Sequence, residues 1–379
     1  MNPSPWSEQE RRFASQSTSQ QLGALHALFL EQSAHYIGFP NSRILSFEEL
    51  GAFLKFNINN IGDPYHPNDG INTCLLEQEV IAFWAEQLHL DPEFAWGYIT
   101  SGSTEAIMYG IAQGRDRFKD PVLLFSEECH YCLPKIAHLL QLPVRVIPSL
   151  KDGSLNLEAL SDLIVSLNGR PFILNLTVGT TFHGAIESPR AVLAILERHQ
   201  CRDVHVHVDA ALYGPMLPWI DGSEVFDFRL PIHTLSFSGH KFLGSPMPCG
   251  VLISHRNRIT PYEGCAQYVG SLDTTLSSSR NGLSTLVLWM LIRRLGRDGM
   301  ADLAQDAFAL AAETTEQMSR AGIPVSRHPY GCILVFPKPD DGIARRWHLS
   351  TRGEFAHLVT LPGVTRDMIQ TFISQLAEG

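Results

Sequence analysis

The stretch VLLFSEECHYCLPKIAHLLQLPVRVIPS, residues 122–149, shows the pattern that decides the fold. It opens with a short apolar run and continues with apolar residues at helical spacing over 132–142. It closes with the β-rich run VRVIPS, residues 144–149. A strand, a helix and a second strand in this order predict two parallel strands with a helix packed across them.

The same alternation continues on both sides of this stretch. Strands are expected in AWGYITSG (95–102), FILNLTVG (172–179), HVHVDAA (205–211), IHTLSFSGH (232–240) and GVLISH (250–255). Helices are expected over 75–90, 103–118, 155–167 and 189–200. This repetition predicts an α/β fold in which a mostly parallel sheet is covered by helices on both faces.

The pattern changes toward both ends of the chain. Helical spacing is present over 20–35 and again from Phe47, after Ser46 as N-cap, and the Asn-, Gly- and Pro-rich segment 58–72 predicts an irregular loop. From about Leu286, a long helical stretch is followed by short strands and a closing helix, which indicates a smaller α+β domain. We therefore predict an N-terminal arm with helices (1–45), a large domain (46–290) and a small C-terminal domain (291–379).

Composition narrows the class of protein. The chain has 379 residues, a formal net charge of −10, 44% hydrophobic and 18% charged residues, which is typical of a globular protein. The acidic balance argues against nucleic-acid binding. No apolar run is long enough to cross a membrane and the N-terminus lacks a secretory h-region, so a cytoplasmic protein without membrane contact is expected.

The seven cysteines are odd in number and irregularly spaced, as expected for free thiols in a reducing compartment. Cys129 and Cys132 form a C-x-x-C pair, for which a redox or zinc role is the alternative to buried structural thiols. A second ligand pair at comparable spacing is missing, so buried thiols are favoured and no metal is expected there.

The segment Ser101-Gly102-Ser103-Thr104-Glu105 lies between a predicted strand and a predicted helix. Backbone N–H groups at the start of a helix, together with the hydroxyls of Ser103 and Thr104, could hold a phosphate. A plain turn with an N-cap explains the same residues, so this signal is weak when taken alone.

The strand HVHVDAA places His205, His207 and Asp209 on one side, because alternate residues of a strand face the same way. One interpretation is the metal site of a metallohydrolase. A second uses only Asp209, at the end of a strand, as a partner for a protonated ring nitrogen of a cofactor. A third is that both histidines are packed strand residues.

Two further residues follow predicted strands. Lys241 comes after SFSGH in uncharged, Gly- and Pro-rich surroundings; a lysine withdrawn from water has a lowered pKa and can form a Schiff base, whereas a solvated loop lysine is the ordinary alternative. His130 follows VLLFSE and could stack on an aromatic ring or be structural. A phosphate cradle, a stacking histidine, a ring-nitrogen partner and a Schiff-base lysine together are the parts that hold pyridoxal phosphate.

These residues belong to stretches that resemble the pyridoxal-phosphate-dependent group II amino-acid decarboxylases. The matching stretches are FNINNIGDPY (56–65), WGYITSGSTEAIMYG (96–110), CHYCLPKI (129–136), VGTTFHGAI (178–186), HVDAALYGPMLPW (207–219), SFSGHKFLGSPMPCG (236–250) and SSRNG (278–282). The chain most resembles the short bacterial histidine decarboxylases and the related plant serine decarboxylases. The resemblance implies the fold-type I architecture of pyridoxal-phosphate enzymes, with the large domain binding the cofactor.

The resemblance also implies roles for single residues. Lys241 would form the Schiff base, Asp209 would keep the pyridine nitrogen protonated and His130 would stack on the ring. Ser103, Thr104, Ser238 and His240 would hold the phosphate, Thr180 would support Asp209, and Ala211 would pack under the ring. The active site would lie at the interface of an obligate homodimer, or of a higher oligomer built from it. Candidates for contacts with substrate or partner subunit are Tyr65, Tyr213, Ser279, Arg280 and Leu283.

The implied reaction is decarboxylation of an L-amino acid to an amine and CO2, with histidine as first choice and serine or another neutral or aromatic amino acid next. Three positions depart from the family pattern. The family has His after S-R-N-G, where this chain has Leu283. This chain also has the bulky Tyr213 after D-A-A-L, and Ala106 where the family has Gly. We expect these departures to affect the choice of substrate rather than the cofactor.

Overall fold

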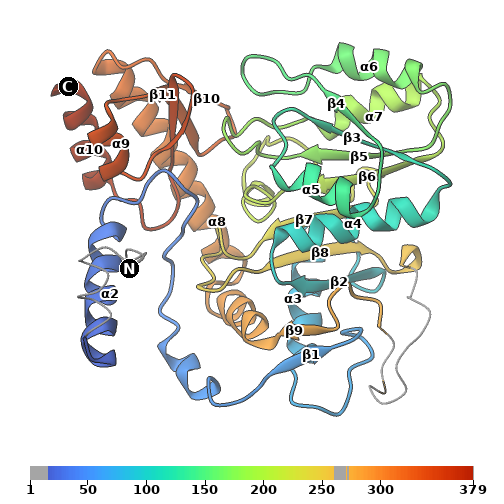
Figure 1. Cartoon of the computed structure of the whole chain (residues 1–379), viewed down its shortest axis with the longest axis horizontal. Helices are drawn as coiled ribbons and strands as arrows, with labels where there is room; N and C mark the ends of the chain where they lie inside the picture. The colour runs from blue at the N-terminus through green and yellow to red at the C-terminus, as the bar shows by residue number, and fades with distance from the viewer. Residues whose placement is uncertain (1–15, 260–269, 271–272, 379) are drawn as a thin grey trace, which may run out of the picture.

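The structure is a computed structural model that describes residues 16–259, 270 and 273–378. The predicted arm up to residue 15 and Cys265 lie outside the described residues. A seven-stranded sheet forms the centre of the molecule, with strand order β2-β8-β7-β6-β5-β3-β4 (Figure 1). The strands are β2 (Ala95–Thr100), β8 (Gly250–His255), β7 (Thr234–Ser238), β6 (Val204–Asp209), β5 (Phe172–Thr177), β3 (Val122–Ser126) and β4 (Val144–Ile147).

The five strands from β7 to β4 run parallel, and β8 is antiparallel to both of its neighbours. The prediction of a mostly parallel sheet is therefore confirmed. All residues of β2, β3, β5, β6 and β7 are buried, which explains why these segments read as nearly continuous apolar runs.

Helices cover both faces of this sheet. Leu123, Phe125 and Ile173 pack with α4 (Ser103–Arg117) and α5 (Cys132–Leu139). The alternate strand residues Val122, Leu124 and Leu174 belong to the main core, which includes α6 (Leu157–Ser166) and α7 (Pro189–Arg198). Helix α3 (Cys74–Gln87) packs on β2. The period of two along each strand thus separates the apolar side chains onto two covered faces.

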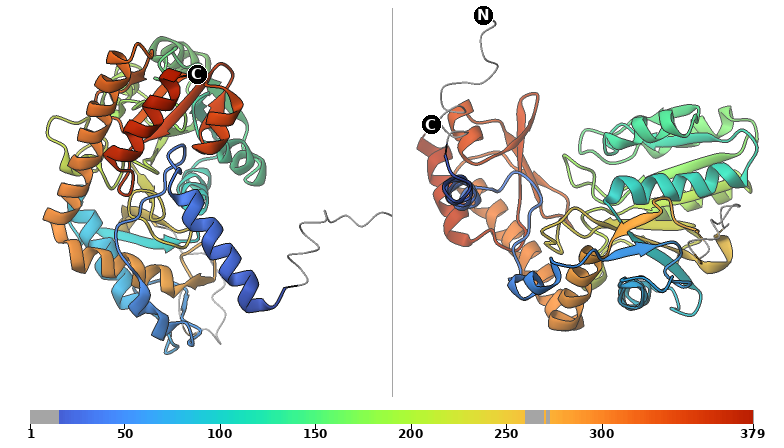
Figure 2. Two further views of the ribbon diagram at one scale, coloured as in Figure 1. Left: turned by 90° about the vertical axis from the view of Figure 1, so that its left-hand side faces the viewer. Right: turned by 60° about the horizontal axis from the view of Figure 1, so that its bottom comes forward.

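The C-terminal part has its own four-stranded antiparallel sheet, in the order β10-β11-β13-β12. Its elements are β10 (Ser326–Arg327), β11 (Ile333–Pro337), α9 (Asp341–Arg346), β12 (Ser350–Arg352), β13 (Phe355–Val359) and α10 (Arg366–Glu378). Helix α8 (Gly282–Arg320) links the two parts of the molecule (Figures 1 and 2). The predicted boundary at residue 290 falls inside α8, whereas the helix is interrupted at Gly296, whose φ of 60° is the left-handed conformation that glycine tolerates.

The N-terminal elements differ from the prediction in detail. Helix α2 (Thr18–Ser33) is capped by Ser17 and buries none of its residues. The segment after Ser46 forms only a short 3-10 helix, η1 (Glu48–Phe53), and part of the expected loop is strand β1 (Asn59–Ile61), which pairs with β9 (Ser279–Asn281). Two more 3-10 helices are η2 (Leu217–Trp219) and η3 (Arg256–Arg258). None of the described helices is both long and apolar enough to cross a membrane.

Candidate active site

A cavity of about 790 Å³ opens where α4 begins and where β6 and β7 end. In a parallel sheet this carboxyl edge is where ligands bind. The cavity brings together eight residues that the sequence predicted for the cofactor: Ser103, Thr104, His130, Asp209, Ala211, Ser238, His240 and Lys241.

The hydroxyls at the start of α4 and the end of β7 form one polar corner of this cavity. Ser103 Oγ lies 2.6 Å from Ser238 Oγ. The N-cap residue of α4 is Gly102, which has no side chain, so no side-chain hydrogen bond caps the first turn of this helix. Gly250 is required opposite, because a Cβ there would come within 2.9 Å of the Ser103 nitrogen. Uncapped helix N–H groups beside two hydroxyls suit a phosphate.

Asp209 and Lys241 are opposite charges withdrawn from water beside the same cavity. Burial raises the pKa of Asp209 to about 6, although the nearby Lys241 and the Ala211 N–H, 3.1 Å from Oδ1, act in the opposite direction. Burial lowers the pKa of Lys241, and Asp209 opposes that shift. A buried lysine with a lowered pKa has a greater fraction of neutral, nucleophilic amine.

Two of the histidines that line the cavity, His130 and His240, are uncharged at neutral pH. Burial, with Lys241 and Lys135, lowers the pKa of His130 to about 4. The His130 ring lies in the loop between β3 and α5, and its Nδ1 accepts the Cys132 N–H at 3.3 Å. Burial also lowers the pKa of His240, whose Nδ1 lies 2.8 Å from the carbonyl oxygen of Cys249. A neutral imidazole such as His130 can stack on a cationic ring without charge repulsion.

Thr180 does not line the cavity. It is fully buried, and its Oγ1 accepts the Ala185 N–H at 3.0 Å, so it holds a turn. Thr177 lines the cavity instead and pairs in register with Asp209 across β5 and β6. Its buried Oγ1 makes no hydrogen bond with the described residues. The sequence contains no signal for this pairing, because strand register between distant segments depends on tertiary packing.

The five residues predicted for substrate or partner contacts all lie outside the cavity of their own chain. Tyr213 is fully buried, and its hydroxyl accepts the Cys332 N–H at 3.1 Å. Tyr65 packs 4.3 Å below the Arg256 guanidinium, Ser279 is exposed, and Leu283 is half-buried in the first turn of α8. A direct role for Tyr213 in substrate choice is therefore not supported, because its ring fills the core.

Arg280 is buried in an ion pair with Glu77 and also donates to the carbonyl oxygen of Gly62 at 3.0 Å. The Glu77 carboxylate accepts the Ile99 N–H at 2.7 Å, two residues before the turn that leads to Ser103. The guanidinium of Arg280 is thus engaged within its own chain and is not free to reach a partner's cofactor. Its buried position ties β9 to the strand that precedes the phosphate corner.

The sequence did not predict that the N-terminal segment and the small C-terminal sheet form one wall of the cavity. Phe39 and Pro40 come from the segment after α2, and Ile333, Ser350, His357 and Val359 come from the small sheet. The His357 ring nitrogens lie 2.9 Å from the Phe182 carbonyl oxygen and 3.1 Å from that of Gly38, which joins all three parts. No local motif marks these residues, because their role arises only from the docking of the small domain.

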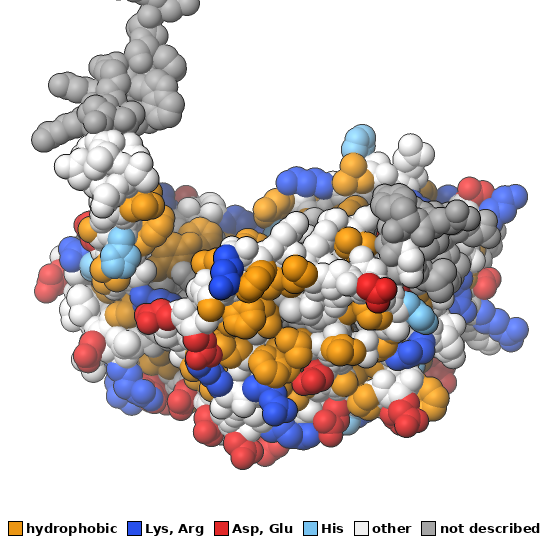
Figure 3. Space-filling view, turned by 90° about the horizontal axis from the view of Figure 1, so that it is seen from below, with side chains coloured by type: hydrophobic (Ala, Val, Ile, Leu, Met, Phe, Trp, Pro, Cys, Tyr) orange, Lys and Arg blue, Asp and Glu red, His pale blue; other side chains and the backbone are white. Residues whose placement is uncertain are grey.

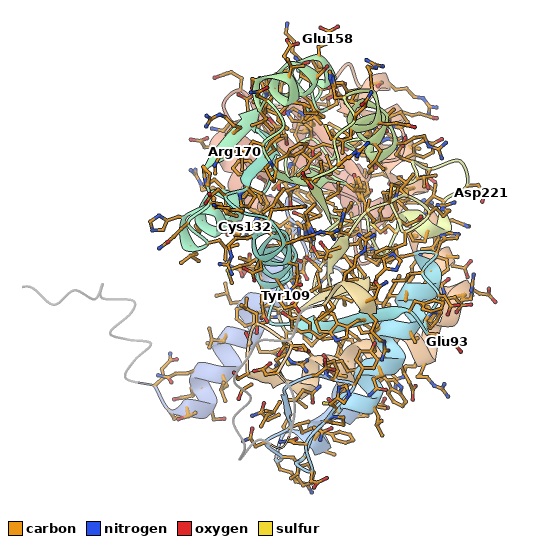
Figure 4. All side chains as sticks on the ribbon, turned by 90° about the vertical axis from the view of Figure 1, so that its right-hand side faces the viewer. Glu93, Tyr109, Cys132, Glu158, Arg170 and Asp221 are labelled. Atoms are coloured by element: carbon orange, nitrogen blue, oxygen red, sulfur yellow. The ribbon has the colours of Figure 1, made fainter. Side chains whose placement is uncertain are left out.

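The histidines of β6 serve the packing of the sheet. His207 Nδ1 lies 2.8 Å from Thr234 Oγ1, and its Nε2 lies 3.1 Å from Ser236 Oγ. Within the described residues, no cluster of three His, Cys, Asp or Glu side chains is suited to a metal ion. Figure 4 shows Cys132 at the start of α5, next to α4, and burial raises the pKa of both thiols of the C-x-x-C pair.

Comparison with known proteins decides between the interpretations. Residues 53–323 match the model of the pyridoxal-dependent decarboxylase conserved domain. The chain belongs to this family. It is thus a pyridoxal-phosphate-dependent amino-acid decarboxylase, and the metallohydrolase interpretation of His205, His207 and Asp209 is wrong.

The similar proteins differ in their substrates. The chain is 32% identical to a histidine decarboxylase of Mesorhizobium japonicum, over 94% of this chain and 96% of that protein. It is 33% identical to serine decarboxylase 1 of Oryza sativa subsp. japonica, over 92% of this chain and 73% of that protein. L-methionine decarboxylase from Streptomyces sp. 590 superposes with a TM-score of 0.87 at 24% identity, covering 98% and 95% of the two chains. This last match confirms the fold-type I architecture.

Proposed function

We propose that the protein converts L-histidine to histamine and CO2, with Lys241 and Asp209 as catalytic residues and His130 beside them. The observation that carries the cofactor part of this proposal is the placement of the half-buried Lys241 amine, the buried Asp209 carboxylate and the Ser103–Ser238 corner around one cavity. These are the groups that pyridoxal phosphate requires: an amine for its aldehyde, an acid for its ring nitrogen and donors for its phosphate.

Each side chain would meet one part of the cofactor. Lys241 Nζ would bind the aldehyde carbon, and the Asp209 carboxylate would hold a proton on the pyridine nitrogen. Ser103, Thr104, Ser238 and His240 would bind the phosphate. Ala211 and the His130 ring would enclose the pyridine plane, and Thr180 would act from outside by holding the turn to Ala185. Thr177 Oγ1, beside Asp209, makes no hydrogen bond in the described part of the chain and leaves one donor for this site.

The bound cofactor supplies an electron sink for the pair of electrons left on Cα when CO2 departs. The protein supplies charge and orientation. Asp209 must be ionised to hold the ring proton, and a cationic ring beside it would favour that charged form against the burial that raises its pKa to about 6. The site also has to hold the Cα–carboxylate bond perpendicular to the ring plane, so that this bond breaks rather than Cα–H.

The cavity wall favours a substrate with an uncharged side chain. Apart from Asp209, Glu105 is the acidic residue of the described lining, and its oxygens already accept the Ser101 N–H at 2.9 Å and the Tyr98 hydroxyl at 3.3 Å. Phe39, Ile333 and Val359 supply apolar surface. A cationic side chain would therefore lack a partner, whereas imidazole, hydroxymethyl and thioether groups would be tolerated.

Histidine is favoured over serine because the histidine decarboxylase of Mesorhizobium japonicum matches over nearly its whole length. The test is kcat/KM of the holoenzyme for histidine, serine and methionine. We expect histidine to be highest by at least about tenfold, which corresponds to about 1.4 kcal/mol. A higher value for serine or methionine would overturn the substrate assignment and leave the decarboxylase assignment intact.

We further propose that the working unit is a homodimer. Helix α2 exposes Leu22, Phe29 and Leu30 at 61%, 58% and 62%, although a free monomer has no reason to expose such a face. Figure 3 shows hydrophobic side chains gathered on the face seen from below. Around η1, β1 and the start of α3, the exposed hydrophobic residues are Phe53, Leu54, Phe56, Ile71 and Leu75. Light scattering should give twice the chain mass, and Phe29→Ser with Leu30→Ser should shift that mass toward the monomer. A monomeric wild-type holoenzyme would contradict the dimer.

A further inference from the structure

A second cavity, of about 470 Å³, lies at the opposite edge of the seven-stranded sheet. It is lined by Gln113, Asp116 and Arg117 at the end of α4, by His205, His233 and Thr234 at the start of β6 and β7, and by Ser254, Asn257 and Arg258 at the end of β8 and in η3. The elements α4, β6 and β7 each have one end here and the other end at the active site. We call this the distal cavity.

Positive charge in the distal cavity is not compensated by the described part of the chain. Arg258 has a buried Nη1 that makes no hydrogen bond there, and no ion pair to Arg117 is formed by the described residues. Asp116 is the acidic side chain of the lining, and its carboxylate is bound at 2.7 Å by Arg115. Arg117 is exposed and its guanidinium lies 5.7 Å from the centroid of the Phe118 ring, and neither arginine has a carboxylate partner among the described residues.

Burial and the arginines of the distal cavity lower the pKa values of the basic groups around them. Burial and the charge of Arg117 both lower the pKa of Arg258. Burial, His205 and the two arginines lower the pKa of His233 to about 2, and burial first, then His207, lowers that of His205 to about 3. The histidines are therefore neutral at physiological pH. The charged groups of the described lining are then Arg117, Arg258 and Asp116, and Asp116 is bound by Arg115.

The remaining polar groups supply donors. His233 Nδ1 accepts the Val206 N–H at 3.1 Å, so the proton of the neutral ring is on Nε2. Ser254 Oγ donates to the His233 carbonyl oxygen at 3.0 Å and can still accept, while the amides of Gln113 and Asn257 can donate. A ligand with several acceptor oxygens and negative charge matches this set.

We propose that the distal cavity binds a small oxyanion of the phosphate class, with Arg117 and Arg258 as its main ligands. Guanidinium groups present planar pairs of N–H donors that match phosphate oxygens in two-point contacts. The cavity is separate from the predicted phosphate corner at Ser103, because α4 runs its full 15 residues between the two. The distal site would thus be occupied in addition to the cofactor.

The test uses the holoenzyme with saturating cofactor, so that the active-site phosphate position is already filled. Inorganic phosphate is titrated by calorimetry against sodium chloride of equal ionic strength. We expect one saturable phosphate per chain in addition to the cofactor. Arg117→Ala and Arg258→Ala should each weaken it by about tenfold or more. Arg198→Ala, an exposed arginine at the end of α7, should leave phosphate binding unchanged.

Three results separate the outcomes. Loss of phosphate binding in both cavity variants, with an unchanged cofactor spectrum and unfolding temperature, supports the site. Arg258→Lys keeps the charge but not the planar fork, so it should bind phosphate with intermediate affinity. No saturable binding to the wild-type holoenzyme, or equal binding by wild type and both alanine variants, would overturn the proposal.

Discussion

Ser103 Oγ and Ser238 Oγ lie 2.6 Å apart, although 135 residues separate them in the chain. Ser103 opens α4 and Ser238 closes β7, so the contact exists only because β7 and α4 pack together at the carboxyl edge of the sheet. Two hydroxyls from different elements thereby meet at the wall of one cavity. Their proximity is the structural basis for assigning the phosphate corner.

Ser238→Ala should weaken cofactor binding by about tenfold or more, since a hydrogen bond to a charged group contributes about 1.5–3 kcal/mol. The measurement is the change in visible absorbance on titrating the cofactor into stripped enzyme. Ser319→Ala, on the exposed end of α8, is the matched control. Equal affinities for wild type and Ser238→Ala would remove Ser238 from the phosphate corner.

Lys241→Ala should abolish turnover and the visible band that borohydride removes, because Lys241 is the lysine of the described cavity lining. The exposed Lys119 offers a control, and Lys119→Ala should keep both. Peptide mapping after borohydride reduction should place the cofactor on Lys241. A label on another lysine would contradict the assignment.

Asp209→Asn should leave the fold intact but reduce turnover by orders of magnitude, because a neutral amide cannot hold the ring-nitrogen proton by charge. Far-UV circular dichroism would verify the fold. Chelator should leave the wild-type rate unchanged, since His207 is engaged by Thr234 and Ser236. Near-normal activity of Asp209→Asn would show that Asp209 is not the partner of the ring nitrogen.

Tyr213→Phe should lower stability without changing substrate preference. Its hydroxyl accepts the buried Cys332 N–H, and leaving that donor unpaired costs about 1–3 kcal/mol. Urea unfolding measures the loss, and the ratio of kcat/KM for histidine and serine measures preference. A changed ratio of kcat/KM for histidine and serine, with unchanged stability, would indicate that Tyr213 does influence substrate choice.

Glu187 gives a pH dependence with a defined sign. Its buried carboxyl is bound by Ser126 and by the Thr177 N–H, and burial raises its pKa from 4.5 to about 7. Between these values the folded state holds a proton that the unfolded state has lost, so stability falls as pH rises. Glu187→Gln should flatten this fall, measured by urea unfolding from pH 4.5 to 7.5. Identical slopes for both proteins would contradict a raised pKa.

The strand–helix alternation from residue 95 to 255 predicted the sheet because buried parallel strands have continuous apolar runs. The sequence also predicted Ser103, Asp209 and Lys241 as site residues, since each lies at the end of a strand or at the start of a helix. The sequence predicted a longer helix where the structure has only the short 3-10 helix Glu48–Phe53. Apolar spacing indicates helical periodicity but does not show how many turns form.

Features that depend on contacts between distant parts of the chain could not be predicted from the sequence. Thr177 reaches the cavity through its register with Asp209, and His357 through docking of the small sheet. Leu283 and Tyr213 stood out as departures from a family pattern, yet packing places both outside the cavity of their own chain. The expected contact of Leu283 with the neighbouring subunit's site stays a prediction.

The most direct measurement is incubation of the purified holoenzyme with each of the twenty amino acids, with amine and CO2 quantified together. We expect histamine and CO2 in equal amounts from L-histidine, and loss of both in Lys241→Ala. Absence of amine from every amino acid, or formation of a keto acid without CO2, would contradict the assignment of this site to decarboxylation.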